Sequence, residues 1–148
     1  MQNINKVFSN SSKDDSGGIL CVLEGRSPIV PFNILRVYYT CGVKEGYIRG
    51  YHAHNTLNKV LVCLSGKIEI TMDDGLGNIS TTIINGPTDS LFVGSLMWHT
   101  MKWLEDDSIL LVLASQRYNE LDYIRDYCVF LETVKMKGRQ KKDYEDTI

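Results

Sequence analysis

The sequence predicts an all-β fold, a sandwich or closed barrel, with one short helix near the C-terminus. Short segments of strand-forming residues recur along the chain, separated by turns at spacings of roughly eight to twelve residues. One of them, residues 67–73, alternates strictly between apolar and polar side chains, as a half-buried strand does. Apolar residues at helical spacing occur only after residue 118. A run of strands followed by a single helix is therefore expected.

The composition is that of an ordinary globular protein. The chain has 148 residues, of which 43% are hydrophobic and 23% are charged, enough for one domain with a sizeable core. A net charge of −2 argues against a general nucleic-acid binder, because no basic excess covers the surface. We expect a single domain over residues 1–148, in the cytoplasm, with no contact with nucleic acid or membrane.

Two further signals support the cytoplasmic expectation. The longest strongly apolar run, residues 109–114, is far too short to span a bilayer, and the first residues lack the apolar core of a secretory signal. The four cysteines are scattered without a Cys-x-x-Cys pair. They are expected to be reduced and mostly buried thiols.

Polar or glycine- and proline-rich stretches bound each predicted strand. Residues 1–18 are polar and contain a cluster of Ser, Asn, Asp and Gly, which predicts a loop. Residues 25–31 hold two prolines and residues 73–78 form an Asp-Asp-Gly hairpin loop. The strands predicted between such stretches are residues 19–23, 34–40, 49–54, 60–64, 67–73, 79–84, 91–93 and 109–114.

The end of the chain carries the only helical pattern. Asn119 or Asp122 is suited to cap a helix whose apolar residues recur at helical spacing, namely Leu121, Ile124, Cys128 and Leu131. From Gly138 the chain is charged and has no apolar face, so residues 138–148 are expected to be a frayed or disordered tail.

The segment from Arg49 to His54, Arg-Gly-Tyr-His-Ala-His, is the first candidate site. On a strand, His52 and His54 project from the same face, whereas a helix would place them about 200° apart. Arg49 adds a permanent cation, and Gly50 lets the backbone bend or approach a ligand. The plain alternative is a solvated strand end with two incidental histidines.

A metal site is one interpretation of these histidines. His-x-His on one strand, a nearby carboxylate and a third histidine on a distant strand resemble the metal-binding pattern of cupins, and His52, His54 and His99 fit the histidine places. The carboxylate of this pattern is missing, because Asn58 and Lys59 occupy its position in the sequence. A lysine at that position would repel a divalent cation. Three-histidine zinc sites exist, so a metal-dependent cupin enzyme stays open as an alternative.

Acid–base chemistry is the other interpretation. A neutral imidazole beside fixed cations tends toward a lowered pKa and remains available as a base. Arg36 and Arg49 are suited to phosphates, and Arg36, among β-branched and aromatic residues, needs an anionic partner. The tyrosines offer hydroxyl donors and flat faces, or pack in the core: Tyr38, Tyr39 and Tyr51. His99, beside Trp98, is expected to be partly buried, as a structural or site-lining residue.

Eight segments, in order across most of residues 19–131, resemble one family, the sugar-nucleotide 3,4-ketoisomerases of the cupin class. They are Arg36-Val-Tyr-Tyr39, Arg49-Gly-Tyr-His-Ala-His54, Val60-Leu-Val-Cys-Leu-Ser-Gly66, Asp73-Asp-Gly75, Val93-Gly94, Trp98-His99, Leu111-Val-Leu-Ala-Ser115 and Tyr118-Asn-Glu-Leu-Asp-Tyr-Ile-Arg125. The resemblance implies a jelly-roll homodimer without a metal or cofactor, acting on thymidine-diphosphate-linked 4-keto-6-deoxyglucose in the synthesis of deoxy sugars for cell-surface polysaccharides. Gly17-Gly18, Asn55 and Thr100 depart from the family pattern, which bears on substrate contacts and product stereochemistry.

The resemblance also implies roles for the candidate residues. His54 is expected to be the main base for a ketone shift from C4 to C3 through an enediolate, with His52 as its partner or proton shuttle. Arg49 and a tyrosine, Tyr39 or Tyr38, would stabilise the oxyanion. Arg36 would hold the diphosphate, and Tyr51 and His99 would contact substrate. A non-catalytic cupin that binds a sugar nucleotide is a further alternative.

Overall fold

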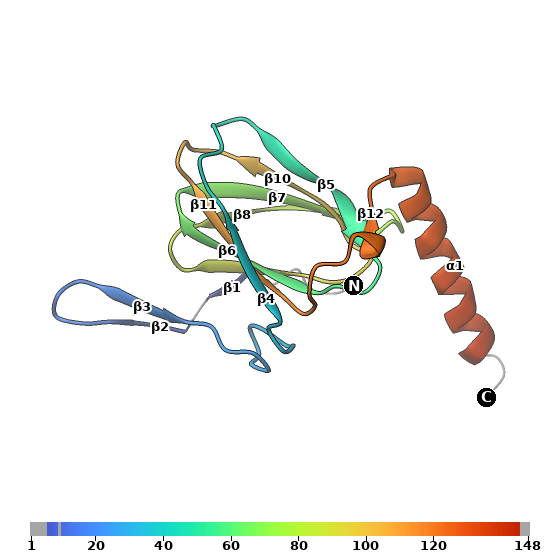
Figure 1. Cartoon of the computed structure of the whole chain (residues 1–148), viewed down its shortest axis with the longest axis horizontal. Coiled ribbons are helices and arrows are strands. Elements are labelled where there is room, and N and C mark those ends of the chain that lie inside the picture. Colours follow the sequence, from blue (N-terminus) through green and yellow to red (C-terminus); the bar gives the residue numbers. More distant parts are fainter. Residues whose placement is uncertain (1–5, 9, 146–148) are drawn as a thin grey trace.

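Two five-stranded antiparallel sheets make up most of the molecule (Figure 1). The computed structural model describes residues 6–8 and 10–145. In sheet order, the first sheet contains β1 (Lys6–Phe8), β9 (Asp89–Val93), β6 (Lys59–Ser65), β11 (Ile109–Ala114) and β4 (Arg36–Thr40). The second contains β12 (Tyr123–Ile124), β5 (Ile48–His54), β10 (Trp98–Trp103), β7 (Lys67–Asp73) and β8 (Ile79–Asn85). The predicted all-β fold is confirmed.

The main core lies between the two sheets and follows from the strand patterns. Along β7 the apolar side chains Ile68, Ile70 and Met72 are buried, and the polar side chains between them are less so. The strand β6 is central in its sheet and is buried from Lys59 to Cys63, as its continuous apolar run predicts. Trp103 is fully buried in this core, and its indole N–H donates to the carbonyl oxygen of Ser108 at 3.0 Å.

Two of the sequence expectations, for the N-terminal segment and for the cysteines, are wrong. Within the predicted loop of residues 1–18, residues 6–8 pair with β9, and β2 (Asn10–Lys13) forms a hairpin with β3 (Ile19–Val22) that extends away from the sheets (Figure 1). The cause is strand pairing, with a distant partner for β1 and with the next strand for β2, which overrides a polar local sequence. Among the cysteines, Cys41 and Cys128 are exposed and only Cys63 is buried.

The C-terminal helix is shifted and longer than predicted. Asn119 caps a short 3₁₀ turn, Glu120–Asp122, and α1 runs from Tyr127 to Glu145. The carboxylate of Asp126 accepts the backbone N–H of Val129 and so caps the start of α1. Lysine, arginine and glutamine are good helix formers, so the charged segment continues the helix instead of fraying at residue 138. Residues 146–148 of the expected tail lie outside the described chain.

The helix is attached mainly through its first turns. Phe130 and Val134 pack against Ala53 of β5 and Ile124 of β12, and the rest of α1 extends past the sheets (Figure 1). In the described part of the chain, no helix is long and apolar enough to cross a membrane.

The pairing of β5 with β10 positions the candidate histidines. His99 on β10 lies directly opposite His52 on β5, and the register shifts at the next residue of β10. Gly50 sits at this irregularity with a φ of 102°, and a Cβ atom there would lie 2.7 Å from the carbonyl oxygen of His99. Only glycine fits this close approach of the two backbones.

Candidate active site

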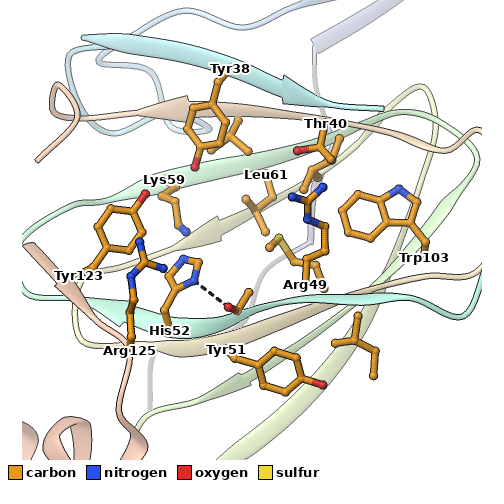
Figure 2. Close-up of a pocket in the computed structure, with 15 residues that line it drawn as sticks. Tyr38, Thr40, Arg49, Tyr51, His52, Lys59, Leu61, Trp103, Tyr123 and Arg125 are labelled. Carbon is orange, nitrogen blue, oxygen red and sulfur yellow. Dashed lines mark hydrogen bonds between the residues drawn. The ribbon is translucent and has the colours of Figure 1, made fainter. Parts of the chain in front are cut away.

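A cavity of about 480 Å³ opens between the two sheets (Figure 2). Its walls come from strands far apart in sequence, including β4, β5, β6, β10 and β12, and its floor is apolar. Its polar lining consists of the hydroxyl, imidazole and cationic side chains of Tyr38, Thr40, Arg49, Tyr51, His52, Lys59, Tyr123 and Arg125. A hollow that combines apolar walls with convergent polar and charged groups is typical of a site for a polar small molecule.

The three histidines of the chain form one cluster beside this cavity. The ring centroids of His52 and His54 are 5.1 Å apart, and those of His52 and His99 are 4.7 Å apart. His52 lines the cavity, whereas His54 and His99 are buried behind it. As predicted, alternation along β5 places His52 and His54 on the same face. The pairing of β10 with β5 then brings His99 next to them.

Each histidine has an acceptor next to its Nδ1 atom. The Nδ1 of His52 lies 3.0 Å from the carbonyl oxygen of Gly50, and that of His99 lies 3.1 Å from the carbonyl oxygen of Met97. The Nδ1 of His54 lies 3.3 Å from Oδ2 of Asp122. A carbonyl or carboxylate oxygen only accepts, so the proton of each neutral ring sits on Nδ1 and the lone pair on Nε2. These contacts hold His52 and His99 in the tautomer that has a basic Nε2. For His54, the nearby Asp122 carboxylate favours the same tautomer by its charge, although the contact does not have the geometry of a hydrogen bond.

The electrostatics keep these rings neutral. Burial, followed by the nearby positive charge of Lys59, lowers the pKa of His52 to about 4. The same two causes, in the same order, lower the pKa of His54 and place that of His99 well below its usual value. Near pH 7 the site therefore offers neutral imidazoles, the form needed to remove a proton.

Cations and phenols surround His52. Arg49 and Arg125 both reach the cavity, and Arg125 stacks on the ring of Tyr123 at 4.2 Å. Glu120 holds Arg125 with two hydrogen bonds, of 3.0 and 3.1 Å. Tyr38 extends from the opposite sheet, and burial raises the pKa of its phenol to about 12, so the phenol keeps its proton. The cavity can therefore bind an anionic ligand and move protons on it.

The structure brings together some of the residues singled out from the sequence and separates others. Arg49, Tyr51, His52 and Tyr38 line the cavity. Tyr39 points the other way on β4 and is 68% exposed, as alternation along the strand requires.

Arg36 also lies outside the main cavity. Its guanidinium group stacks over Tyr38 and Tyr118, at 5.0 and 5.5 Å from the ring centres. Its Nε atom is buried without a hydrogen bond in the described structure. It lines a small hollow that also contains His54 and Tyr123.

Four residues of the site were not singled out from the sequence. They are Lys59, Asp122, Tyr123 and Arg125. A signal existed for Lys59, since a lysine directly before a fully apolar strand is unusual. The other three belong to the Asp-Tyr-Ile-Arg segment, whose helical spacing obscured that Tyr123 pairs with β5.

A metal fits this donor set poorly. In the described residues no group of three or more histidine, cysteine, aspartate or glutamate side chains is arranged to hold an ion. The Nζ atom of Lys59 lies 2.7 Å from Nε2 of His99, the nitrogen that a metal would need. An ammonium group in that place opposes a divalent cation.

Comparisons with known proteins agree with this geometry. Residues 2–135 match the model of the FdtA family, described as "WxcM-like, C-terminal". The TDP-4-oxo-6-deoxy-alpha-D-glucose-3,4-oxoisomerase of Aneurinibacillus thermoaerophilus is 39% identical over 138 residues, covering 93% of this chain and 98% of that protein. The resemblance inferred from the sequence is confirmed.

Solved structures give the same result. A 3,4-ketoisomerase from Helicobacter canadensis superimposes with a TM-score of 0.84 at 38% identity, covering 91% of this chain and 99% of that one. A variant of the 3,4-ketoisomerase QdtA from Thermoanaerobacterium thermosaccharolyticum, solved with TDP-4-keto-6-deoxyglucose, has a TM-score of 0.83 at 34% identity, covering 92% and 96%.

A more distant match supports the fold alone. The RmlC epimerase of Mycobacterium tuberculosis has a TM-score of 0.67 at 17% identity, covering 80% of this chain and 66% of that one. With the ketoisomerase structures, it confirms the expected cupin jelly roll.

Proposed function

Because the chain belongs to the FdtA (WxcM-like) family of 3,4-ketoisomerases, we propose that it converts TDP-4-keto-6-deoxyglucose to the 3-keto isomer. The observation that carries this proposal is the pair of neutral histidines, His52 and His54, each with an unprotonated Nε2, beside a cavity lined by cations. A ketone shift between adjacent carbons needs a base and an oxyanion stabiliser and no other reagent.

The proposed reaction moves two protons, one between carbons and one between oxygens. The ketone at C4 acidifies the proton at C3, and a histidine removes it to give an enediolate. The hydroxyl proton on O3 passes to O4, and protonation at C4 leaves the ketone at C3. The substrate's own ketone accepts the electron pair, so no cofactor is required. Two histidines whose ring centres lie 5.1 Å apart are suited to serve two neighbouring carbons.

We assign His54 as the main base, held by Asp122, and His52 as the proton shuttle that faces the cavity. Tyr123 lines both the main cavity and the small hollow that contains His54, and its ring centre lies 4.3 Å from that of His54, so in this assignment the Tyr123 ring moves aside for the substrate to reach His54. Of the two tyrosines on β4, the geometry favours Tyr38 over Tyr39 as the oxyanion donor, because Tyr39 is on the outer face.

The position of Arg36 favours other residues as diphosphate ligands. Arg36 is stacked between tyrosines away from the main cavity, whereas Arg49 and Arg125 both reach into it. Guanidinium groups bind phosphate oxygens through paired hydrogen bonds. We therefore assign the diphosphate to Arg49 and Arg125, and Tyr51 as a further substrate contact from the cavity lining.

We further propose a homodimer in the cytoplasm. The edge strand β4 carries the exposed apolar side chains Val37 and Tyr39, preceded by the exposed Leu35, and Leu20 of the projecting hairpin is 64% exposed. A long apolar edge left open invites pairing with another chain, so a second copy is the natural cover.

Incubation with TDP-4-keto-6-deoxyglucose in deuterium oxide, followed by NMR of the product, tests the activity. An isomerase installs deuterium at the ring carbons and yields the 3-keto sugar, and the spectrum also assigns the gluco or galacto product. Binding without label would support a non-catalytic sugar-nucleotide-binding cupin. Activity lost on chelation and restored by added metal would support a metal-dependent cupin enzyme instead.

A further inference from the structure

Lys59 is a buried lysine that reaches the catalytic cavity. It is the first residue of β6 and only 2% exposed, yet its side chain lines the cavity beside His52 and Tyr123 (Figure 2). Lysines are rarely buried this fully unless they are paired. Its burial in the cavity wall therefore needs an explanation.

A fixed histidine orients this lysine. His99 is fully buried, and its Nδ1–H donates to the carbonyl oxygen of Met97 at 3.1 Å. Its Nε2 therefore presents a lone pair, which lies 2.7 Å from Nζ of Lys59. An ammonium group has three N–H donors, so one bond to His99 leaves two for the cavity.

The ammonium group has no anionic partner in the described structure. Its hydrogen bond goes to a neutral imidazole, and no described carboxylate forms a salt bridge with it. Burial, with the positive charge of Arg36 as the second cause, lowers its pKa to about 7. A negative oxygen placed in the cavity would compensate this buried charge and raise the pKa again.

We propose that Lys59, oriented by His99, is a catalytic residue that donates a hydrogen bond to the sugar oxygen on which negative charge develops. This inference rests on the proposed ketoisomerase function, in which removal of the C3 proton places that charge on the C4 oxygen. Lys59 forms no covalent bond and keeps its protons, because the histidines carry the transferred protons. His99 is its positioning residue.

The test compares Lys59→Met with wild type on TDP-4-keto-6-deoxyglucose, and uses Lys67→Met as a matched control. Lys67 is an exposed lysine that pairs with Glu105. For Lys59→Met we expect kcat to fall about 10²–10³-fold, as when one oxyanion donor is removed. We expect the affinity for TDP, measured by calorimetry, to stay within about twofold, since the assigned contact is to the sugar. The melting temperature should change little, because methionine removes a buried charge that has no anionic partner but leaves Nε2 of His99 without its hydrogen bond.

Two further measurements separate catalysis from structure. In Lys59→Ala, added propylammonium should restore part of the lost kcat in a saturable way. His99→Gln should lower kcat with little change in KM, since it disturbs the orientation of the lysine and leaves the nucleotide contacts intact.

Several results would overturn the inference. The first is a Lys59→Met variant with kcat within threefold of wild type. The second is a loss of TDP affinity that accounts for the whole loss of activity in that variant. The third is a Lys59–substrate adduct trapped by borohydride, which would make the lysine a nucleophile. A wild-type protein that neither converts nor labels the substrate would contradict the proposed function itself. Active wild type with an unimpaired Lys59→Met variant contradicts only the role of Lys59.

Discussion

The Oδ2 atom of Asp122 lies 3.3 Å from the Nδ1 atom of His54, and both side chains are buried. The same carboxylate accepts hydrogen bonds from the backbone N–H groups of Thr56 and Leu57 and from the hydroxyl of Thr56. One aspartate thus ties the segment after β11 to the end of β5 and fixes the tautomer of the proposed base. Such an orienting carboxylate is a common partner of catalytic histidines.

Asp122→Asn should lower both stability and turnover. An amide replaces one acceptor oxygen with an NH₂ donor, which cannot accept from Thr56 or Leu57, so we expect a loss of about 1–3 kcal/mol in the free energy of unfolding. With the tautomer of His54 no longer fixed, kcat should fall about 10–100-fold. Denaturant titration and NMR assays measure the two effects.

Asp126→Asn is the matched control for that variant. Asp126 caps α1 through the backbone N–H of Val129, and asparagine caps equally well. Stability and activity should stay close to wild type. If Asp122→Asn behaved like Asp126→Asn, the orienting role of Asp122 would be excluded.

His54→Asn should abolish turnover and leave TDP binding intact. Asparagine occupies a similar volume but has no basic nitrogen, so the C3 proton has no acceptor. His52→Asn should retain a residual rate if it serves as the shuttle. Deuterium incorporation and calorimetry with TDP separate the two functions. An equal loss of binding and turnover in His54→Asn would refute its role as base.

The pKa values of the histidines predict the behaviour in acid. Because the pKa of His52 is about 4 in the folded chain, kcat/KM should not decline on the acid side until pH falls below about 5, whereas an ordinary histidine titrates near 6.5. A pH–rate profile with an acid limb centred near 6.5 would contradict this.

Stability should follow the same pKa values. Between about pH 6.5 and pH 4 the unfolded chain binds protons on histidines whose pKa is lowered on folding, so the free energy of unfolding falls as pH falls. For His52 alone the loss between pH 7 and pH 5 is on the order of 1–2 kcal/mol. Denaturant titrations at both pH values measure it, and His52→Asn should show a smaller difference.

Gly50→Ala should disrupt the pairing of β5 with β10. A Cβ atom at Gly50 would lie 2.7 Å from the carbonyl oxygen of His99, and φ is 102°. Gly46→Ala is the control, since Gly46 has a φ of 83° and no atom within 4 Å of its added Cβ. Both lose the conformational freedom of glycine, so a larger loss of stability at Gly50 isolates the steric contact. Equal losses would show that β10 yields to the methyl group.

Val37→Arg should produce a monomer. Val37 lies at the centre of the exposed apolar row on β4 and is 56% exposed, so an arginine there places a charge in the proposed dimer interface. Sedimentation velocity measures the change. Leu76→Arg, at another exposed apolar residue, in the loop between β7 and β8, should leave the oligomeric state unchanged. A wild-type chain that sediments as a monomer would contradict the dimer.

Features that follow from the spacing of residues along a single strand were predictable from the sequence. The alternation along residues 67–73 predicted the buried face of β7, and two-residue spacing placed His52 and His54 on one side of β5. The missing carboxylate also turned the interpretation from metal ligands toward proton carriers. The buried face of β7 and the shared side of His52 and His54 depend only on backbone geometry within a single strand.

Other parts of the site depend on which strands pair and in which register. Nothing local indicated that Lys59 would meet His99, that Asp122 would orient His54, or that Tyr123 would add a strand beside β5. The helical spacing after residue 118 even favoured the wrong element. Local pattern specifies which face of a strand is buried, whereas contacts between distant strands are decided by sheet order and register. The sequence by itself therefore determined the all-β class and the histidine pair, and only the tertiary structure decided what surrounds that pair.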